Sequence, residues 1–190
     1  MKTSELVLIH LPSLTLNVEF KKGQLNLLVG NNGAGKTSLL LALLGEPVVK
    51  SGTIDFPSVD KLAFLPQEPI FPDHLRVRDL LKLAALGKPP AEDKIEEELS
   101  FFRLKALENR SLGDLSSGER QKAFLARTLL QPCQVILLDE PTNHLDADVT
   151  DLLWDRLSRL PSQGKEVIAS THDRVVLKSD RFHKILISAS

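Results

Sequence analysis

The stretch Gly30-Asn31-Asn32-Gly33-Ala34-Gly35-Lys36-Thr37 decides the fold that this sequence predicts. It follows the apolar run 25–29 and precedes another apolar run that begins at Ser38, which is the order strand, glycine loop, helix. In that context the pattern G-x-x-x-x-G-K-[ST] is typical of a phosphate-binding loop, or P-loop. Glycines let successive backbone N–H groups curl around a phosphate chain, and the helix directs its positive end at the same anion. We therefore expect the amine of Lys36 on the β- and γ-phosphates of a nucleotide and the hydroxyl of Thr37 on Mg²⁺.

The composition is that of one globular domain. The chain has 190 residues, 42% hydrophobic and 26% charged, which excludes the disordered and collagen-like classes. Lys and Arg number 24 against 25 Asp and Glu, without a dense basic block, so no direct nucleic-acid partner is expected. The single cysteine fits a reducing compartment. No apolar run approaches the roughly 20 residues that span a bilayer, and the N-terminus lacks a signal-peptide pattern, so a membrane role is expected only through a partner.

Hydrophobic periodicity predicts strands that alternate with helices. Strands are expected at 5–10, 14–20, 24–29, 50–56 after a turn, 61–65, 135–138, 166–170 and 182–187, and helices from 38 and at 77–84, 93–107, 122–130 and 148–160. Prolines 66, 69 and 72 exclude regular structure between them and indicate a loop. The predicted fold is α/β: a P-loop core with a mainly parallel sheet, an N-terminal antiparallel β flap and a helical insertion.

Two carboxylates follow a strand that is apolar throughout. Residues 135–138 are all apolar, as in a parallel strand buried on both faces, and Asp139 and Glu140 come directly after them. At that place Asp139 can hold the Mg²⁺ that Thr37 also holds, and Glu140 can polarise an attacking water. With the P-loop upstream, this pair indicates the second half of a nucleoside triphosphatase.

These motifs, together with others in the same order, resemble the ATP-binding cassette (ABC) ATPases, in particular the nucleotide-binding subunit of an ABC transporter. The family's Q-loop matches Gln67, its signature motif matches 115–121, its D-loop matches 143–146 and its switch histidine matches His172. The signature is the most specific of these motifs because other P-loop families lack it. The resemblance covers nearly all of the chain and implies one nucleotide-binding domain, 1–190. Residues 1–66 and 132–190 would form its catalytic core lobe, and 67–131 the Q-loop, helical subdomain and signature.

The resemblance also implies a role for each matched residue. ATP and Mg²⁺ would be the cofactors, in a head-to-tail dimer in which each ATP lies between the P-loop of one subunit and the signature of the other. Catalytic roles would fall to Glu140, His172 and Lys36. Nucleotide contacts would come from Gly30, Asn31, Asn32, Gly33, Ala34, Gly35, Lys36, Thr37, Ser38, Gln67 and His10, and metal contacts from Thr37, Gln67 and Asp139. Ser116, Ser117, Gly118 and Glu119 would face the nucleotide of the partner subunit, and Asp146 would lie at the dimer seam.

The sequence departs from the family pattern at two places. The signature has Ser117 where a glycine and Glu119 where a glutamine are commonest, while the serine and glycine at 116 and 118 are kept, so we expect function to survive. The family usually stacks an aromatic residue on adenine, but this chain has no tyrosine, and His10 or Leu11 lies in that neighbourhood.

Two functions follow from the resemblance. The first is the ATP-hydrolysing motor subunit of an ABC transporter, a homodimer that is cytoplasmic and peripheral on the inner face of the cell membrane through separate integral membrane permease subunits. Ile70 and Phe71, apolar residues in the proline-rich loop, would suit a partner surface or packing between the lobes. The alternative is a soluble ABC ATPase that acts on ribosomes or nucleic acid, because 141–146 and 171–174 resemble the ribosome-associated branch.

Overall fold

A parallel sheet forms the centre of the computed structural model, which describes residues 1–85, 89–172 and 174–188. Within these residues the sheet has five strands in the order β5-β6-β7-β3-β8, and every neighbouring pair is parallel. The strands are β3 (Leu25–Val29), β5 (Leu62–Leu65), β6 (Val135–Leu138), β7 (Glu166–Ser170) and β8 (His183–Leu186). Strand β3, which precedes the P-loop, lies between β7 and β8, and only β7 separates it from β6. Because all of these strands are parallel, the carboxyl ends of β3, β6 and β7 lie at the same edge of the sheet.

The predicted antiparallel flap is confirmed. It comprises β1 (Lys2–Leu8), β2 (Leu11–Glu19) and β4 (Val49–Asp55) in the order β2-β1-β4. Alternate residues of β2, namely Leu14, Leu16 and Val18, are buried, which is the period expected of a strand with one face on the core. The flap therefore covers the sheet with one apolar face and exposes the other.

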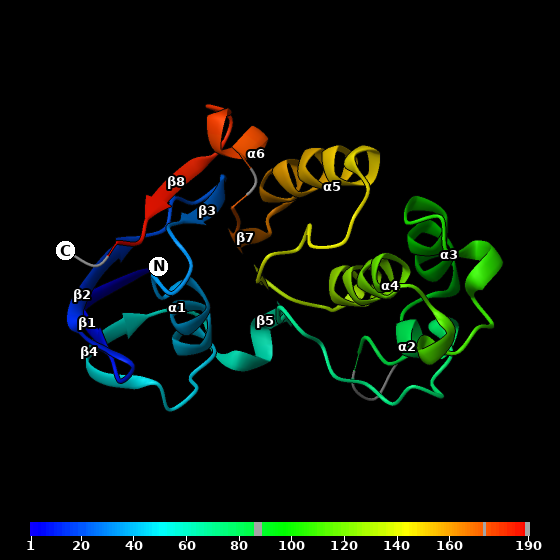
Figure 1. Cartoon of the computed structure of the whole chain (residues 1–190), viewed down its shortest axis with the longest axis horizontal. Coiled ribbons are helices and arrows are strands. Elements are labelled where there is room, and N and C mark those ends of the chain that lie inside the picture. Colours follow the sequence, from blue (N-terminus) through cyan, green and yellow to red (C-terminus); the bar gives the residue numbers. More distant parts are fainter. Residues whose placement is uncertain (86–88, 173, 189–190) are drawn as a thin grey trace.

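The helices fall into two groups. Helix α1 (Lys36–Leu43) lies beside the flap, and α5 (Ala147–Arg159) and the short α6 (Arg174–Lys178) follow β6 and β7. Helices α2 (Val77–Lys82), α3 (Glu92–Phe101) and α4 (Ser117–Leu130) gather at the end of the molecule opposite the flap (Figure 1). Short 3₁₀ turns occur at Val59–Lys61, Lys105–Leu107, Leu112–Asp114 and Leu160–Gln163. Residues 66–75 contain neither helix nor strand, as the three prolines predict.

Two helix boundaries differ by several residues from the sequence-based prediction, and one helix was not predicted. The helix expected at 93–107 ends at Phe101, because Arg103 adopts a left-handed conformation with φ 57°. There the N–H of Leu104 bonds the carbonyl of Leu99 (2.7 Å), a Schellman termination that usually has glycine at this position. Helix α4 begins at Ser117 rather than 122, and α6 was not predicted.

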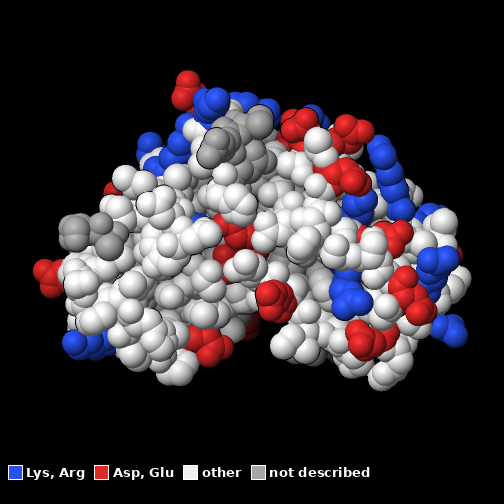
Figure 2. Space-filling model, in the orientation of Figure 1, with Lys and Arg blue, Asp and Glu red and all other residues white. Residues whose placement is uncertain are grey.

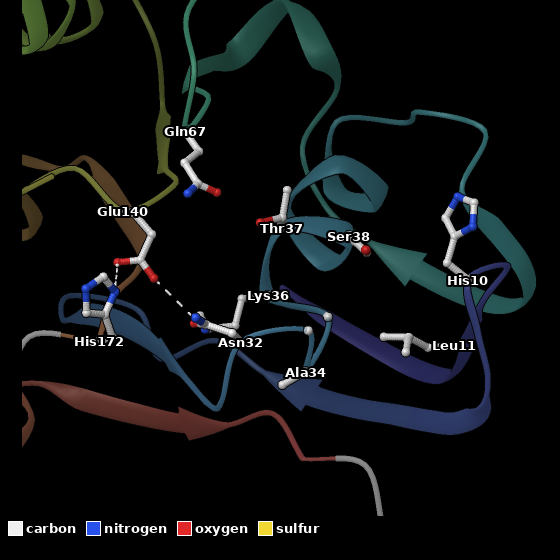
Figure 3. A pocket seen from close by; sticks show the side chains of 12 residues that line it. His10, Leu11, Asn32, Ala34, Lys36, Thr37, Ser38, Gln67, Glu140 and His172 are labelled. Carbon is white, nitrogen blue, oxygen red and sulfur yellow. Dashed lines mark ion pairs between the residues drawn. The ribbon is translucent and has the colours of Figure 1, made fainter. Parts of the chain in front are cut away.

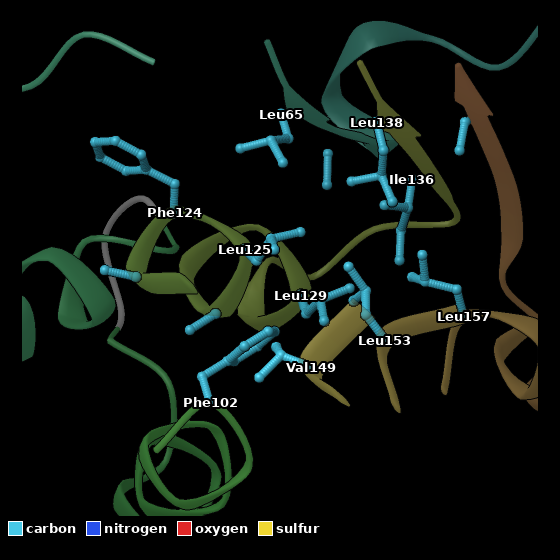
Figure 4. Close-up of a cluster of buried hydrophobic side chains, with 14 of the residues drawn as sticks. Leu65, Phe102, Phe124, Leu125, Leu129, Ile136, Leu138, Val149, Leu153 and Leu157 are labelled. Atoms are coloured by element: carbon cyan, nitrogen blue, oxygen red, sulfur yellow. The ribbon is translucent and has the colours of Figure 1, made fainter. Parts of the chain in front are cut away.

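Two buried clusters lie on opposite faces of the sheet because alternate residues of β6 point to opposite sides. Ile136 and Leu138 belong to a cluster that continues through α4 and α5, where Leu125 and Leu153 are fully buried (Figure 4). Val135 and Leu137 belong to the other cluster, which packs the sheet against α1 and the flap. The sheet is thus buried on both faces, and the polar residues Asp139, Glu140 and Ser170 lie at its carboxyl edge.

Candidate functional site

A cavity of about 450 Å³ lies at the carboxyl ends of the strands, between the P-loop and the segments that follow β5, β6 and β7 (Figure 3). His10 and Leu11 lie at one end of it, and Glu140 and His172 lie at the other. Its lining residues are His10, Leu11, Asn32, Gly33, Ala34, Gly35, Lys36, Thr37, Ser38, Gln67, Glu140 and His172. Five separate parts of the sequence therefore meet around one cavity.

The P-loop has the backbone that its glycines predict. Gly33 and Gly35 have φ values of 79° and 102°, in the left-handed region that favours glycine. Gly30 is required for a different reason: a Cβ atom there would lie 2.2 Å from the carbonyl oxygen of Ile187. Gly35 is the N-cap of α1, and no side chain caps the helix. The first N–H groups of α1 are consequently directed at the cavity without a side-chain acceptor, as an anion site requires.

The amine of Lys36 lies beneath the P-loop. Its Nζ donates hydrogen bonds to the carbonyl oxygens of Gly30 (2.8 Å) and Asn31 (3.3 Å). It also lies 4.0 Å from Oε1 of Glu140 (Figure 3), and Lys36 is buried with 7% exposure. A buried ammonium group costs free energy unless it is paired, so this arrangement holds a positive charge inside the loop.

Asp139 and Glu140 lie directly after β6 and are both buried. The hydroxyl of Ser170, at the end of neighbouring β7, donates to Oδ1 of Asp139 (2.5 Å) and accepts from the N–H of Glu140 (2.8 Å). The other oxygen of Asp139, Oδ2, is buried without a hydrogen-bond partner among the described residues. A buried carboxylate oxygen left unpaired is costly in a stable fold, so this atom marks a place where a cation fits.

Glu140 has an unusual backbone and a close partner. Its φ is 49°, which is rare for any residue other than glycine and which accumulates at functional sites. Its Oε2 lies 2.8 Å from Nδ1 of His172, whose side chain is 65% exposed. The carboxylate of Glu140 therefore stands between the imidazole of His172 and the amine of Lys36, at the end of the cavity (Figure 3).

The signature residues lie at the start of α4, outside this cavity. Ser116 caps the helix: its hydroxyl accepts from the N–H of Glu119 (3.3 Å), and the carboxylate of Glu119 accepts from the N–H of Ser116 (2.8 Å). The hydrogen bond from the backbone N–H of Ser116, and after it the side chain of Ser116, lower the pKa of Glu119. The glutamate that departs from the common signature thus completes a capping box. Ser116 and Ser117 are exposed.

The same helix is attached to the segment that follows Glu140. The side-chain amide of the buried Gln121 donates to the carbonyl of Pro141 (3.0 Å), and Lys122 forms an ion pair with Asp146 (3.2 Å). A Cβ atom on Gly118 would lie 2.6 Å from the carbonyl oxygen of His144, so only glycine allows this approach. Three successive contacts therefore fix 141–146 to the signature helix.

The structure brings most of the predicted site residues together. His10, Asn32 to Ser38, Gln67, Glu140 and His172 line the cavity, while Gly30 and Asn31 face Lys36 through their carbonyl groups and Asp139 lies behind Glu140. Ser116 to Glu119 and Asp146 are not among its lining residues. Asp173, part of the 171–174 stretch, lies outside the described residues. Sequence reasoning assigned no role to Ser170, which lies outside every matched motif, and it gave Gln121 no role beyond its place at the end of the signature motif 115–121.

The donor set agrees with Mg²⁺ bound alongside a nucleotide rather than in a cage of protein ligands. Within the described part of the chain, no three His, Cys, Asp or Glu side chains gather as a metal site. The hydroxyl of Thr37 and the amide of Gln67 line the cavity, and Oδ2 of Asp139 is the buried acceptor near it. Mg²⁺ in phosphate sites is commonly held by one or two protein oxygens together with phosphates and waters.

Known proteins are similar to this chain in sequence and in fold. The pattern of the ABC transporter family matches residues 14–143. The chain is 32% identical over 184 residues to a probable siderophore transport system ATP-binding protein of Bacillus subtilis, with 83% of this chain covered. It is 31% identical over 177 residues to a Nod factor export ATP-binding protein of Cupriavidus metallidurans, with 86% of this chain covered. A solved putative ABC transporter ATP-binding protein from Pyrococcus furiosus superposes with a TM-score of 0.85 at 26% identity, covering 98% of this chain and 96% of that one.

The chain is shorter than the two sequence relatives, spanning 65% of the length of the first and 58% of the second. None of the helices in the described ranges is long and apolar enough to cross a membrane.

Proposed function

This chain belongs to the ABC transporter family, and from that membership we propose that it binds and hydrolyses ATP with Mg²⁺ as the motor subunit of a transporter. The observation that carries the proposal is the single cavity where the P-loop, Gln67, Glu140 and His172 meet. We propose further that the chain works as a head-to-tail homodimer on separate membrane permease subunits. It would then lie in the cytoplasm, peripheral on the inner face of the cell membrane.

The P-loop would hold the triphosphate. The backbone N–H groups at the start of α1 and the amine of Lys36 supply the positive potential that phosphates need. His10 and Leu11 lie at the opposite end of the cavity from Glu140, which is where the base would extend if the γ-phosphate lay near Glu140 (Figure 3). The imidazole of His10 and the side chain of Leu11 would then contact adenine in place of the usual aromatic ring.

The hydrolytic step follows from the order of charges. Glu140 would take a proton from a water molecule as the water oxygen forms a bond to the γ-phosphorus. The bond between the γ-phosphorus and the bridging oxygen of the β-phosphate breaks, which gives ADP and phosphate. His172 lies 2.8 Å from the carboxylate and would hold it in place when protonated, and Lys36 would face the negative charge that develops on the phosphate oxygens. Thr37, Asp139 and Gln67 would hold Mg²⁺, which neutralises phosphate charge when bound.

The position of the signature supports a composite site between two chains. Ser116 and Ser117 are exposed at the N-terminus of α4, while the cavity of the same chain has no lining residue from 116–119 among those described. An exposed helix N-terminus that does not line the cavity of its own chain suits an anion bound by another subunit.

The loop after β5 supports a partner surface beside the cavity. Ile70 is 93% exposed, whereas Phe71 stacks on Phe124 of α4 with ring centroids 5.4 Å apart. Phe71 thus packs on α4 within 67–131, while Ile70 faces outward, which suits a permease segment. In the view of Figure 2, Lys and Arg side chains lie next to Asp and Glu over the helices at the right.

The test uses Glu140→Gln, which keeps the shape of the side chain but removes the proton acceptor. We expect ATP to bind, phosphate release to fall at least about a hundredfold, and a dimer to accumulate in ATP and Mg²⁺ by size-exclusion chromatography with light scattering. The control Lys36→Ala should neither bind ATP tightly nor dimerise. Equal turnover in the wild type and Glu140→Gln would contradict the assignment of the base.

The transporter role is tested by the same variant. Tagged Glu140→Gln is recovered from its native cell in detergent with ATP, and the attached proteins are identified by mass spectrometry. A polytopic membrane protein that is absent from the Lys36→Ala sample is the expected result. Ribosomal or DNA-bound proteins in its place would overturn the transporter role and leave the ATPase chemistry standing.

A further inference from the structure

We propose that Ser170 is a positioning residue for both functional carboxylates, an inference that rests on the proposed ATPase function. Its side chain is fully buried at the carboxyl end of β7 and is not among the residues that line the cavity. Its hydroxyl donates to Oδ1 of Asp139 (2.5 Å) and accepts from the N–H of Glu140 (2.8 Å). One hydroxyl therefore binds the side chain of the proposed metal ligand and the backbone of the proposed base.

The first contact determines which oxygen of Asp139 is available. A hydroxyl has one donor hydrogen, and here it is directed at Oδ1. Oδ2 is left buried without a hydrogen-bond partner in the described ranges, so it is the oxygen that can accept a cation. Removing a partner that orients a metal ligand in this way typically lowers metal affinity or activity about 10-fold to 100-fold.

The second contact supports the strained backbone of Glu140. A φ of 49° persists in a residue with a side chain only where the surroundings fix it from several sides. Ser170 fixes the N–H of Glu140, and Gln121 fixes the carbonyl of the next residue, Pro141, at 3.0 Å. The backbone is therefore held on both sides of Glu140, whose carboxylate lies near Lys36 and His172.

The register of the sheet explains why this residue can reach both groups. Leu138 pairs with Ala169 in the parallel ladder of β6 and β7, so Asp139 and Ser170 are the next residues on neighbouring strands. Two residues beyond Ser170 the chain reaches His172. The strand that presents His172 to the carboxylate of Glu140 thus also holds the backbone of Glu140 in place.

The test replaces the hydroxyl. In Ser170→Ala we expect kcat for ATP hydrolysis to fall about 10-fold to 100-fold and the Mg²⁺ concentration for half-maximal nucleotide binding to rise about 10-fold. KM for ATP should stay within about twofold, because Ser170 does not line the cavity. Ser170→Thr, which restores a hydroxyl on a residue that suits strands, should recover most of the turnover.

A matched control loses an equivalent hydroxyl elsewhere. The hydroxyl of Thr3 in the flap is also buried, donates to the carbonyl of Leu16 (3.3 Å) and accepts from the N–H of Val18 (3.1 Å). Thr3→Val should lower the unfolding temperature as Ser170→Ala does, but it should leave kcat and the Mg²⁺ dependence unchanged.

A measurement on the nucleotide-free protein separates this proposal from the ATPase assignment. The amide hydrogen of Glu140 should exchange with solvent faster in Ser170→Ala than in the wild type or Thr3→Val, since its acceptor is gone. Unchanged exchange, or wild-type Mg²⁺ dependence in Ser170→Ala, would overturn the role of Ser170. Failure of the wild type to hydrolyse ATP would refute the proposed function, and the exchange rates would still decide whether Ser170 fixes Glu140.

Discussion

Gly30, the first glycine of the P-loop, is required by its surroundings and not by its own backbone angles. A Cβ atom there would meet the carbonyl oxygen of Ile187 at 2.2 Å, beside the hydrogen bond from Ile187 to Val29 that joins β8 to β3 (2.7 Å). A methyl group at this position must therefore separate two segments of backbone.

We predict that Gly30→Ala lowers the free energy of unfolding by about 3 kcal/mol, because the clash involves backbone on both sides. Gly33→Ala is the matched control: nothing lies within 4 Å of its Cβ position, and only its φ of 79° opposes a side chain. That strain should cost about 1 kcal/mol. Urea unfolding of the three proteins checks the order, and a Gly30→Ala protein as stable as Gly33→Ala would contradict it.

Individual site residues were predictable where a local pattern carries them. The P-loop spacing predicted Lys36 and Thr37, and an apolar run before two acids predicted Asp139 and Glu140; all four now lie in or beside one cavity. Ser170 could not be found in this way, because its role depends on the register of β6 and β7, which brings together residues 31 positions apart. The catalytic roles themselves stay predictions.

The N-terminal cap of helix α4 is also the part of the chain that is expected to face the nucleotide of a partner subunit. Ser116 accepts a hydrogen bond from the N–H of Glu119 and is exposed. We predict that Ser116→Arg leaves ATP binding to the cavity of the same chain unchanged and abolishes turnover, since the arginine would occupy the place of the γ-phosphate of the other subunit. ATP titration and phosphate release measure the two effects.

The cap alone must be separated from that effect. Ser116→Ala should cost about 1 kcal/mol of unfolding free energy, as lost N-caps usually do, and it should retain much of the turnover. If Ser116→Arg hydrolysed ATP at the wild-type rate, the composite site would be wrong; if it failed to bind ATP, the helix would have a role in its own cavity.

Strands and long helices were predictable because their apolar residues repeat with a clear period. The buried strand β6 lies at the predicted residues, whereas β1 and β2 overlap the predicted ranges 5–10 and 14–20 but each begin three residues earlier. Two boundaries were not predictable for physical reasons. Arg103 ends α3 in a conformation usually given to glycine, and the capping box of Ser116 starts α4 five residues early.

An ion pair that no local pattern predicts connects α3, in the helical group, to α5, which follows the central strand β6. Glu98 on α3 is 4% exposed and accepts a hydrogen bond from Nη1 of Arg156 on α5 (2.9 Å), and the guanidinium group lies 4.4 Å from the ring centroid of Phe101. Burial raises the pKa of Glu98, and Arg156 opposes that shift in part. The folded protein therefore binds this proton more tightly than the unfolded chain does.

A raised pKa gives the pH dependence a definite sign. The contribution of Glu98 to stability is fully present below its ordinary pKa of 4.5 and is lost as the pH rises through the raised value. We predict that the unfolding free energy of the wild type, relative to Glu98→Gln, decreases above that pH by up to about 1.4 kcal/mol per pH unit and then becomes constant. Urea unfolding of both proteins from about pH 4 to 8 measures this difference in unfolding free energy. The contributions of the other titratable groups are common to both proteins and cancel. A difference that stays constant over this pH range would contradict the prediction.

The three contacts between α4 and 141–146 have a consequence for the order of events in time. Pro141 directly follows Glu140, which would act on the ATP of its own chain, while the start of α4 would complete the site of the other chain. A displacement of 141–146 or of the start of α4 would therefore move the other segment, because the Gln121 amide, the Lys122–Asp146 ion pair and the close approach of Gly118 connect them. In the proposed dimer, the waiting time before hydrolysis of one nucleotide would therefore depend on whether the other site holds ATP or its products. The turnover rate of the dimer would then differ from the sum of two independent rates.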